Sequence, residues 1–359
     1  MINCLPYFGI FALVFFLNTL AMRQRNRFVR NLLIILGFLG LLFFIGFRFE
    51  VGTDYDAYLR HYNIIREAPW NKIFTFSFEP LTALVFKICS LVIWDERLIF
   101  VVLGFLMLWP IYKVNKIYEY KYLAYSVLLF CVLFLPFGLN GMRQGVALGF
   151  TLLCVVYCMK GNLLSGVFSF LASILFHTSA WVVLPYVIGI LVSKRRGMSF
   201  TKFNVLITSS ISLLVLFFLN GFLMNLGVTR YDYILDSLNV EMFSLNALII
   251  YIPLLSIILF LKSYTMSKDE KNVLKNLSVS GFVFYVVGTV AQYLTRFAYY
   301  FMFSNILLVP ELIQSVQEKK TRLVIKALFL LYLGIFFFVQ YSLRGWHEIL
   351  PYQTWIFGG

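Results

Sequence analysis

The stretch FRFEVGTDYDAYLRHY, residues 47–62, places several ionisable side chains directly after an apolar segment. Asp54 and Asp56 are carboxylates two residues apart, an outline that could hold a divalent cation or take a proton as a general base. Gly52 permits a turn, which would place Asp54 at the mouth of a helix bundle. Because two carboxylates alone hold a divalent ion poorly, we expect no metal site here.

Two further charged residues lie where apolar helices are expected to begin. In FEP, Pro80 suits the first helical position and Glu79 complements the positive end of the helix, which also gives Glu79 a purely structural interpretation. Arg143 and Gln144 lie in NGMRQGVALG, whose glycines recur every four residues and would let another helix approach closely. A charge in such a run, flanked by apolar helix, is a candidate functional residue.

The remaining candidates combine aromatic and basic side chains. His177 in LFHTSAW ends an apolar segment, where it could contact a phosphate or serve only as a structural hydrogen-bonding residue. Arg296 and Tyr299 share a helical face in QYLTRFAYYF. Tyr55 and Tyr58 offer flat faces that suit sugars, but also suit the aromatic belt at a membrane interface.

The elements that must position these residues are transmembrane helices. Of the 359 residues, 61% are hydrophobic and 13% are charged. Soluble proteins carry roughly 25% charged residues, so this chain cannot cover its surface in water and must lie in a bilayer. The sequence therefore predicts an all-α, polytopic membrane protein with a single transmembrane domain over residues 1–359.

Lysine and arginine gather in short clusters between the apolar segments, at residues 23–30, 113–121, 193–202, 262–275 and 318–326. Such clusters mark cytoplasmic loops, so the net charge of +14 indicates membrane topology rather than nucleic-acid binding. With the clusters inside, the apolar segments predict about twelve transmembrane helices and both termini outside. The segment near residues 80–94 is short and is expected to be a partial helix.

On this topology the outer basic residues are mainly arginines, whereas the cytoplasmic clusters are rich in lysine. Arginine grips phosphate or carboxylate bidentately, so these residues suggest an anionic ligand at the outer face. The alternative is that they reach lipid head groups or pair with carboxylates. The candidates are Arg48, Arg143, Arg230, Arg296 and Arg344.

Taken in order, FRFEVGTDYDAY, FEP, RQGVALG, FHTSA and TRFAYYF resemble the EpsG family of Wzy-type polysaccharide polymerases. The resemblance implies a GT-C-like glycosyltransferase in the inner (cytoplasmic) membrane of a bacterium, with its active site on the periplasmic or extracellular side. Such enzymes polymerise polyprenyl-diphosphate-linked oligosaccharide repeat units into O-antigen, capsule or exopolysaccharide. No cofactor is implied. Besides this substrate, the expected partners are membrane lipid, a flippase and a chain-length regulator protein, with no nucleic acid.

The resemblance also suggests roles for the candidate residues. Asp54 is the preferred base, because inverting GT-C enzymes commonly place a carboxylate in the first outer loop, and Glu79 is the alternative. His177 would orient a substrate or phosphate. Arg143 and Arg296 would bind diphosphate, with secondary roles for Arg48, Arg230 and Arg344. Sugar contacts are expected from Gln144, Tyr55, Tyr58 and Tyr299.

Three other classes of membrane protein remain open. A lipid-linked oligosaccharide flippase would also need arginines in an apolar cavity, but with charges along the whole bundle depth and inverted repeats. A membrane acyltransferase would need a central histidine, whereas His177 is expected at the outer end of a helix. A polysaccharide ligase shares most of the polymerase chemistry and is not separated from it by the sequence.

Overall fold

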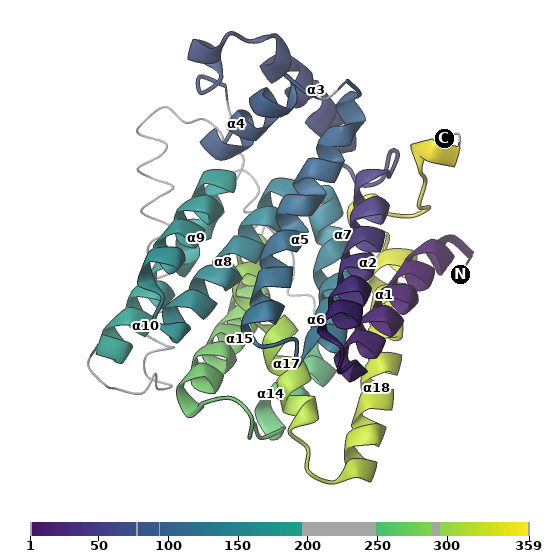
Figure 1. Cartoon of the computed structure of the whole chain (residues 1–359), viewed down its shortest axis with the longest axis vertical. Helices are drawn as coiled ribbons and strands as arrows, with labels where there is room; N and C mark the ends of the chain where they lie inside the picture. Colours follow the sequence, from purple (N-terminus) through teal and green to yellow (C-terminus); the bar gives the residue numbers. More distant parts are fainter. Residues whose placement is uncertain (1, 77, 93, 196–248, 289–294, 358–359) are drawn as a thin grey trace. The chain divides into compact units, whose positions relative to one another are not determined.

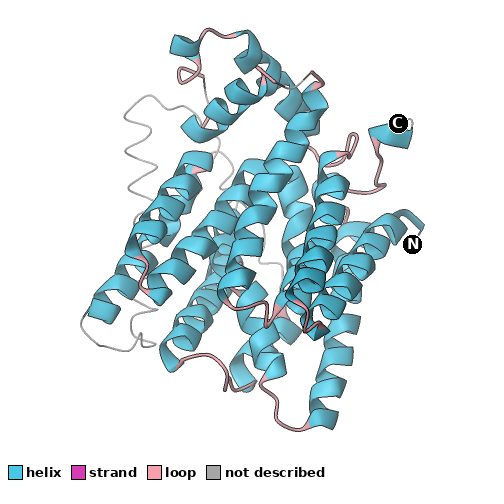
Figure 2. Ribbon diagram, viewed as in Figure 1, coloured by secondary structure: helices cyan, strands magenta, loops and turns pink. Residues whose placement is uncertain are grey.

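The computed structural model describes residues 2–76, 78–92, 94–195, 249–288 and 295–357. These ranges fold into helices joined by loops (Figures 1 and 2). Their only bridge between extended segments is an isolated antiparallel pair, Arg48 with Thr354. The prediction of an all-α protein is confirmed for the described part of the chain.

Six helical segments among the described residues are long and apolar enough to cross a membrane. Each has 18 or more residues, close to the roughly 20 that the hydrocarbon core requires. They are α1 (Leu5–Arg23), α2 (Arg27–Gly46), Glu96–Ile117 with α5 (Ile99–Ile117), Leu123–Asn140 with α6 (Leu123–Leu129) and α7 (Leu135–Asn140), α8 (Met142–Lys160), and Lys319–Leu343 with α18 (Lys319–Phe337). The chain therefore has the character of an integral membrane protein.

Apart from α15, which has 21 residues, the other described helices are shorter than these six segments. They are α3 (Tyr55–Glu67), α4 (Pro80–Cys89), α9 (Leu163–Phe176), α10 (Leu184–Arg195), α14 (Ile252–Phe260), α15 (Lys268–Gly288), α16 (Thr295–Met302) and α17 (Asn305–Gln314). At 1.5 Å per residue, the ten residues of α4 extend about 15 Å, half of the hydrocarbon core. This helix lies where a partial helix was expected and is too short to cross.

The contacts of the chain divide it into two compact units. Unit 1 contains Met1–Gly149, Leu175–His177 and Leu328–Gly359, and unit 2 contains Phe150–Ile174 and Thr178–Ala327. One transmembrane domain over the whole chain stays a prediction. Most of the candidate site residues belong to unit 1.

Small residues let α8 approach α5 closely within unit 1. A Cβ atom at Gly145 would lie 2.8 Å from the Met107 Sδ atom, and one at Gly149 would lie 3.1 Å from Pro110 Cβ. No side chain larger than hydrogen fits at Gly145 without moving its neighbours. The expected close helix contact along NGMRQGVALG is confirmed, and it fixes the position of Arg143 at the start of α8.

Candidate functional site

Arg48 follows the end of α2 and turns into the protein, where it is fully buried. Its Nε donates to the Val51 carbonyl at 3.1 Å, and its Nη1 donates to the Ile45 carbonyl at 3.0 Å. Nη2 donates to the Leu139 carbonyl at 3.0 Å, which ties the loop after α2 to the end of α7. Burial lowers the pKa of Arg48 to about 10, so the side chain stays charged at neutral pH. These contacts give Arg48 a structural role, and diphosphate binding by it stays a prediction.

Gly52 brings the same loop against the end of α7. Its φ of +90° lies in a region that other residues rarely adopt, and a Cβ there would lie 3.1 Å from the Leu139 carbonyl oxygen. The close approach lets Asn140 Oδ1 accept from the Asp54 backbone N–H at 3.1 Å and from the Thr53 hydroxyl. Asn140 thereby satisfies a backbone donor at the N-terminus of α3.

Asp54 is the residue immediately before α3, and its side chain is exposed. A carboxylate in this position is stabilised by the partial positive charge at the helix N-terminus. The Asp56 side chain is exposed as well, one residue inside the helix. In the ranges that the structure describes, no group of three or more histidine, cysteine or carboxylate side chains could hold a metal ion.

Arg143 joins three segments that are far apart in the sequence. Its backbone N–H donates to the Tyr58 hydroxyl at 3.1 Å, which links the start of α8 to α3. Its Nη1 forms an ion pair with Glu79 Oε2, which links α8 to the residue before α4. The GTDYDAY, FEP and RQG stretches therefore converge on one place within unit 1.

The ion pair combines a buried glutamate with an arginine whose side chain is partly exposed. The Glu79 side chain is 4% exposed and the Arg143 side chain is 24% exposed. A guanidinium has five N–H donors, so pairing with one carboxylate oxygen leaves capacity for a second anion. Burial raises the pKa of the neighbouring Tyr58, so its hydroxyl stays neutral at physiological pH. The arrangement holds a fixed cation near Tyr58, which lies one helical turn after the exposed Asp54.

An aromatic contact brings His61 into the same neighbourhood. The His61 ring lies 4.2 Å from the Phe78 ring, and the Arg143 guanidinium carbon lies 5.8 Å from the centroid of that Phe78 ring. His61 follows Asp54 by seven residues and Tyr58 by three, so the three share one face of α3. The sequence analysis gave His61 no role, although its spacing from Asp54 and Tyr58 can be read directly from the sequence.

Asn140 was also missed, although it lies within the quoted stretch NGMRQGVALG. The signal was its Asn-Gly dipeptide, which is typical of a turn between two apolar segments. Asn140 accepts from Thr53 and Asp54, which lie 87 and 86 positions earlier in the chain. Local spacing could not reveal hydrogen bonds between segments so far apart.

His177 directly follows α9 and is half-buried. The carbonyl of the preceding Phe176 accepts a long hydrogen bond, 3.5 Å, from the Thr82 hydroxyl on α4. Thr82 lies three residues after Glu79, within the first turn of α4. The FHTSA stretch therefore also reaches the segment that carries Glu79.

The tyrosines and the glutamine expected to contact sugars are largely buried. Tyr55 is 3% exposed and its ring stacks on Phe100 at 4.5 Å, while Tyr58 is 5% exposed. Burial raises the pKa of Tyr55 to about 12. Gln144 is 3% exposed. These residues are packed inside unit 1, and sugar contacts by them stay a prediction.

The C-terminal segment packs against the loop that carries Asp54. The Gly52 N–H donates to the Glu348 carbonyl at 3.2 Å, and the Phe49 N–H donates to the Gln353 carbonyl at 2.9 Å. Arg344 is exposed and donates to the Gln340 side chain at 2.9 Å. This segment therefore supports the site, with Arg344 at the surface.

The remaining expected site residues lie outside unit 1 or outside the described residues. Arg296 is exposed and Tyr299 is buried, both on α16 in unit 2. Arg230 lies outside the described residues. Their expected roles stay predictions.

Comparison with protein families gives one match. The model described as the EpsG family, which is associated with Wzy-type polymerases and exopolysaccharide biosynthesis, matches residues 31–354. This range covers nearly the whole chain and contains every candidate residue described above. No curated protein and no solved structure matches the chain.

Proposed function

The chain belongs to the EpsG family, and from this premise we propose that it is a Wzy-type polysaccharide polymerase. The proposed reaction joins polyprenyl-diphosphate-linked oligosaccharide repeat units into O-antigen, capsule or exopolysaccharide. The observation that carries the proposal is the convergence of Tyr58, Glu79 and Arg143, which places a partly accessible cation beside the loop of Asp54.

The transfer forms one glycosidic bond and breaks one bond to a diphosphate. A hydroxyl oxygen at the non-reducing end of a lipid-linked repeat unit attacks the anomeric carbon of the growing chain. The bond from that carbon to the diphosphate oxygen breaks, and the lipid diphosphate leaves with the electron pair. The hydroxyl proton goes to a base, and the charge on the leaving diphosphate needs fixed cations.

Arg143 is the proposed cation for the leaving diphosphate. Its N–H groups beyond the one paired with Glu79 would donate to phosphate oxygens, and the buried Glu79 would hold the guanidinium in orientation. A planar group held in this way needs no reorganisation when charge develops on the leaving group. Arg296 and Arg344 are proposed as further cations for the two lipid diphosphates.

Asp54 is the proposed base. It is exposed at the start of α3, so an incoming acceptor hydroxyl can reach it, and Asn140 fixes its backbone. Glu79 is less suited to this role, because it is 4% exposed and already paired with Arg143. His177 is proposed to orient the substrate, supported by the contact between Phe176 and α4.

The proposed topology places the site on the periplasmic or extracellular side of a bacterial inner membrane. About twelve transmembrane helices in a GT-C-like arrangement, with both termini outside, would follow from the basic clusters. In support, Asp54 lies beyond the end of α2, whereas the arginine-rich segment 23–30 lies at its start. A flippase would supply the substrate, and a chain-length regulator would limit the product.

The test is deletion of the gene, followed by gel analysis of the surface polysaccharide and of lipid-linked material. A polymerase predicts single repeat units on the surface and loss of the ladder, restored by the wild-type gene. Accumulation of finished polymer on the lipid would instead indicate a ligase. Loss of all repeat units from the surface would indicate a flippase.

A further inference from the structure

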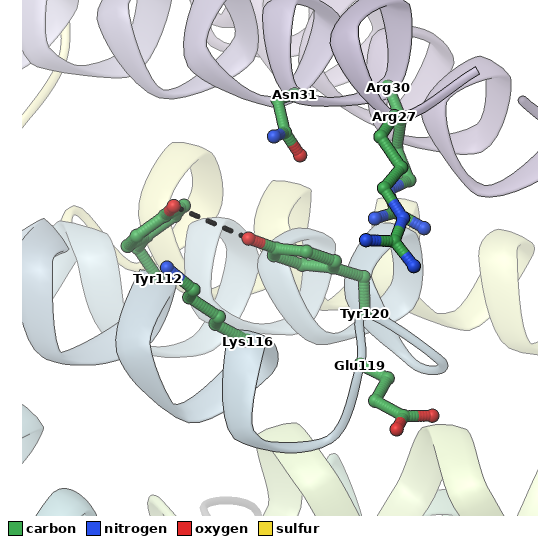
Figure 3. Close-up of a pocket in the computed structure, with 7 residues that line it drawn as sticks. All are labelled: Arg27, Arg30, Asn31, Tyr112, Lys116, Glu119 and Tyr120. Carbon is green, nitrogen blue, oxygen red and sulfur yellow. Dashed lines mark hydrogen bonds between the residues drawn. The ribbon is translucent and has the colours of Figure 1, made fainter.

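A polar cavity lies at the opposite end of α2 from Asp54. Its volume is about 520 Å³. It is lined by the first turn of α2, by the end of α5 and by the turn that follows α5 (Figure 3). The 20 residues of α2 extend roughly 30 Å, so this cavity is separate from the proposed catalytic site.

The cavity carries an excess of positive charge. Arg27 and Arg30 enter it from α2 and Lys116 from α5, while Glu119 is the one carboxylate in its lining (Figure 3). Glu119 is highly exposed, points away from the two arginines and pairs with Lys121 at 3.7 Å. In the described part of the chain, no carboxylate forms an ion pair with these three cations.

The wall opposite the arginines is held in an unusual backbone conformation. Glu119 and Tyr120 have φ values of 53° and 60°, in the left-handed region that non-glycine residues rarely adopt. A hydrogen bond of 2.8 Å from the Tyr120 N–H to the Asn115 carbonyl fixes this turn. The Tyr120 ring then lies 5.6 Å from the Arg30 guanidinium carbon, and its hydroxyl donates to the Tyr112 hydroxyl at 3.3 Å. Strain of this kind is often retained where a ligand binds.

An apolar stripe on α2 begins beside the cavity. Phe28, Leu32, Ile35 and Leu39 recur at helical spacing, and between 44% and 75% of each residue is exposed. In a transmembrane helix such a stripe faces lipid. A ligand that matches both features has an anionic head and an apolar tail.

We infer that this cavity binds the phosphodiester head group of an anionic phospholipid, with its acyl chains along the stripe on α2. Arg30 supplies planar donors for the phosphate, and Lys116 supplies a mobile point charge on the other side. The Nε atom of Arg30 is buried and has no hydrogen-bond partner among the described residues, so the guanidinium is not tied through this atom to another group of the protein. Basic cavities between transmembrane helices are suited to such head groups.

Native mass spectrometry of the delipidated, full-length protein tests the inference. The protein is titrated with phosphatidylglycerol, with phosphatidylcholine as the zwitterionic reference. We expect the wild-type protein to prefer phosphatidylglycerol. In the double variant Arg30→Gln/Lys116→Gln, the affinity for phosphatidylglycerol should fall about tenfold for each cation removed. Because Lys116 is exposed, the single variant Lys116→Gln remains informative if the double variant does not fold.

The matched control is Arg23→Gln/Arg25→Gln, which removes the same charge from exposed positions outside the cavity. The control should bind phosphatidylglycerol as the wild type does. Equal losses in both double variants, or no loss in either, would overturn the inference. A titration with inorganic phosphate distinguishes a lipid head group from a soluble anion. If inorganic phosphate binds as tightly as phosphatidylglycerol, the ligand is a soluble anion and the inference is wrong.

Discussion

Arg143 makes contact with two other segments of unit 1 at once. Its side chain pairs with Glu79, and its backbone N–H donates to Tyr58, so one residue connects α8, α4 and α3. Lysine in this position would keep the charge but would lose the planar fork that can serve a carboxylate and a phosphate together. Substitution of Arg143 therefore tests its proposed contact with a diphosphate.

We expect Arg143→Lys to lose most polymerisation activity, by roughly tenfold or more, because lysine lacks the planar donors that the proposed diphosphate contact requires. The measurement is the polymerisation rate of the purified enzyme with lipid-linked repeat units, read as polymer length on a gel. The matched control is Arg66→Lys, an exposed arginine in the last turn of α3, which should remain close to wild type. Full activity of Arg143→Lys would remove the proposed role of the guanidinium.

Asp54→Asn tests the base. It keeps the size of the side chain but removes the basic lone pair, and it should lower the rate by about two to four decades, the usual contribution of a general base. Binding of the lipid-linked substrate should persist, since the arginines remain. Binding and rate are measured separately on the purified protein.

Glu79→Gln is the companion variant and should behave differently. It weakens a mostly buried ion pair, so we expect a loss of roughly 1–3 kcal/mol in the free energy of unfolding and weaker substrate binding, with a smaller effect on the rate at saturation. If Asp54→Asn polymerises normally while Glu79→Gln binds substrate but is inactive, Glu79 is the base.

At the scale of elements, α3 and α4 hold each other in position. The Lys87 ammonium on α4 donates to the Arg66 carbonyl at 2.9 Å and to the Ala68 carbonyl at 2.7 Å, where α3 ends. A cation there complements the negative end of the helix. The opposite end of α3 depends on the turn at Gly52, which sets Tyr58 and Asp54 against α7 and α8.

Gly52→Ala should destabilise this arrangement. The positive φ and the contact with the Leu139 carbonyl predict a cost of about 1–3 kcal/mol. Thermal unfolding in detergent measures it, together with the polymerisation rate, which should fall as α3 shifts. The control is Gly334→Ala on α18, where a Cβ atom meets nothing within 4 Å, and this variant should be neutral or slightly stabilising. Similar melting temperatures for the two variants would contradict the proposed importance of the turn.

For the whole molecule, the orientation of the helices in the membrane decides on which side the proposed glycosyl transfer occurs. The five cysteines are buried, so they should contribute little background reaction with a maleimide. Asp54→Cys and Arg344→Cys should react with an impermeant maleimide added outside, because both positions are exposed. Lys268→Cys and Lys320→Cys, which are exposed in the basic clusters, should react only after permeabilisation. The reverse pattern would invert the proposed topology.

Composition, charge pattern and motif order were sufficient to predict the class of protein, its family and several of the segments that form the site. Long apolar runs and the charges between them are local properties, so they predicted an all-helical membrane chain, and the ordered motifs predicted the EpsG family that the match confirms. Which side chains meet became visible only in the folded chain. Glu79 and Arg143 are 64 residues apart, Arg48 turns inward because it can reach the carbonyl of Leu139, and Asn140 joins the site through the turn at Gly52. These contacts depend on how the helices pack, because charge and spacing along one helix do not specify the partner that another helix presents.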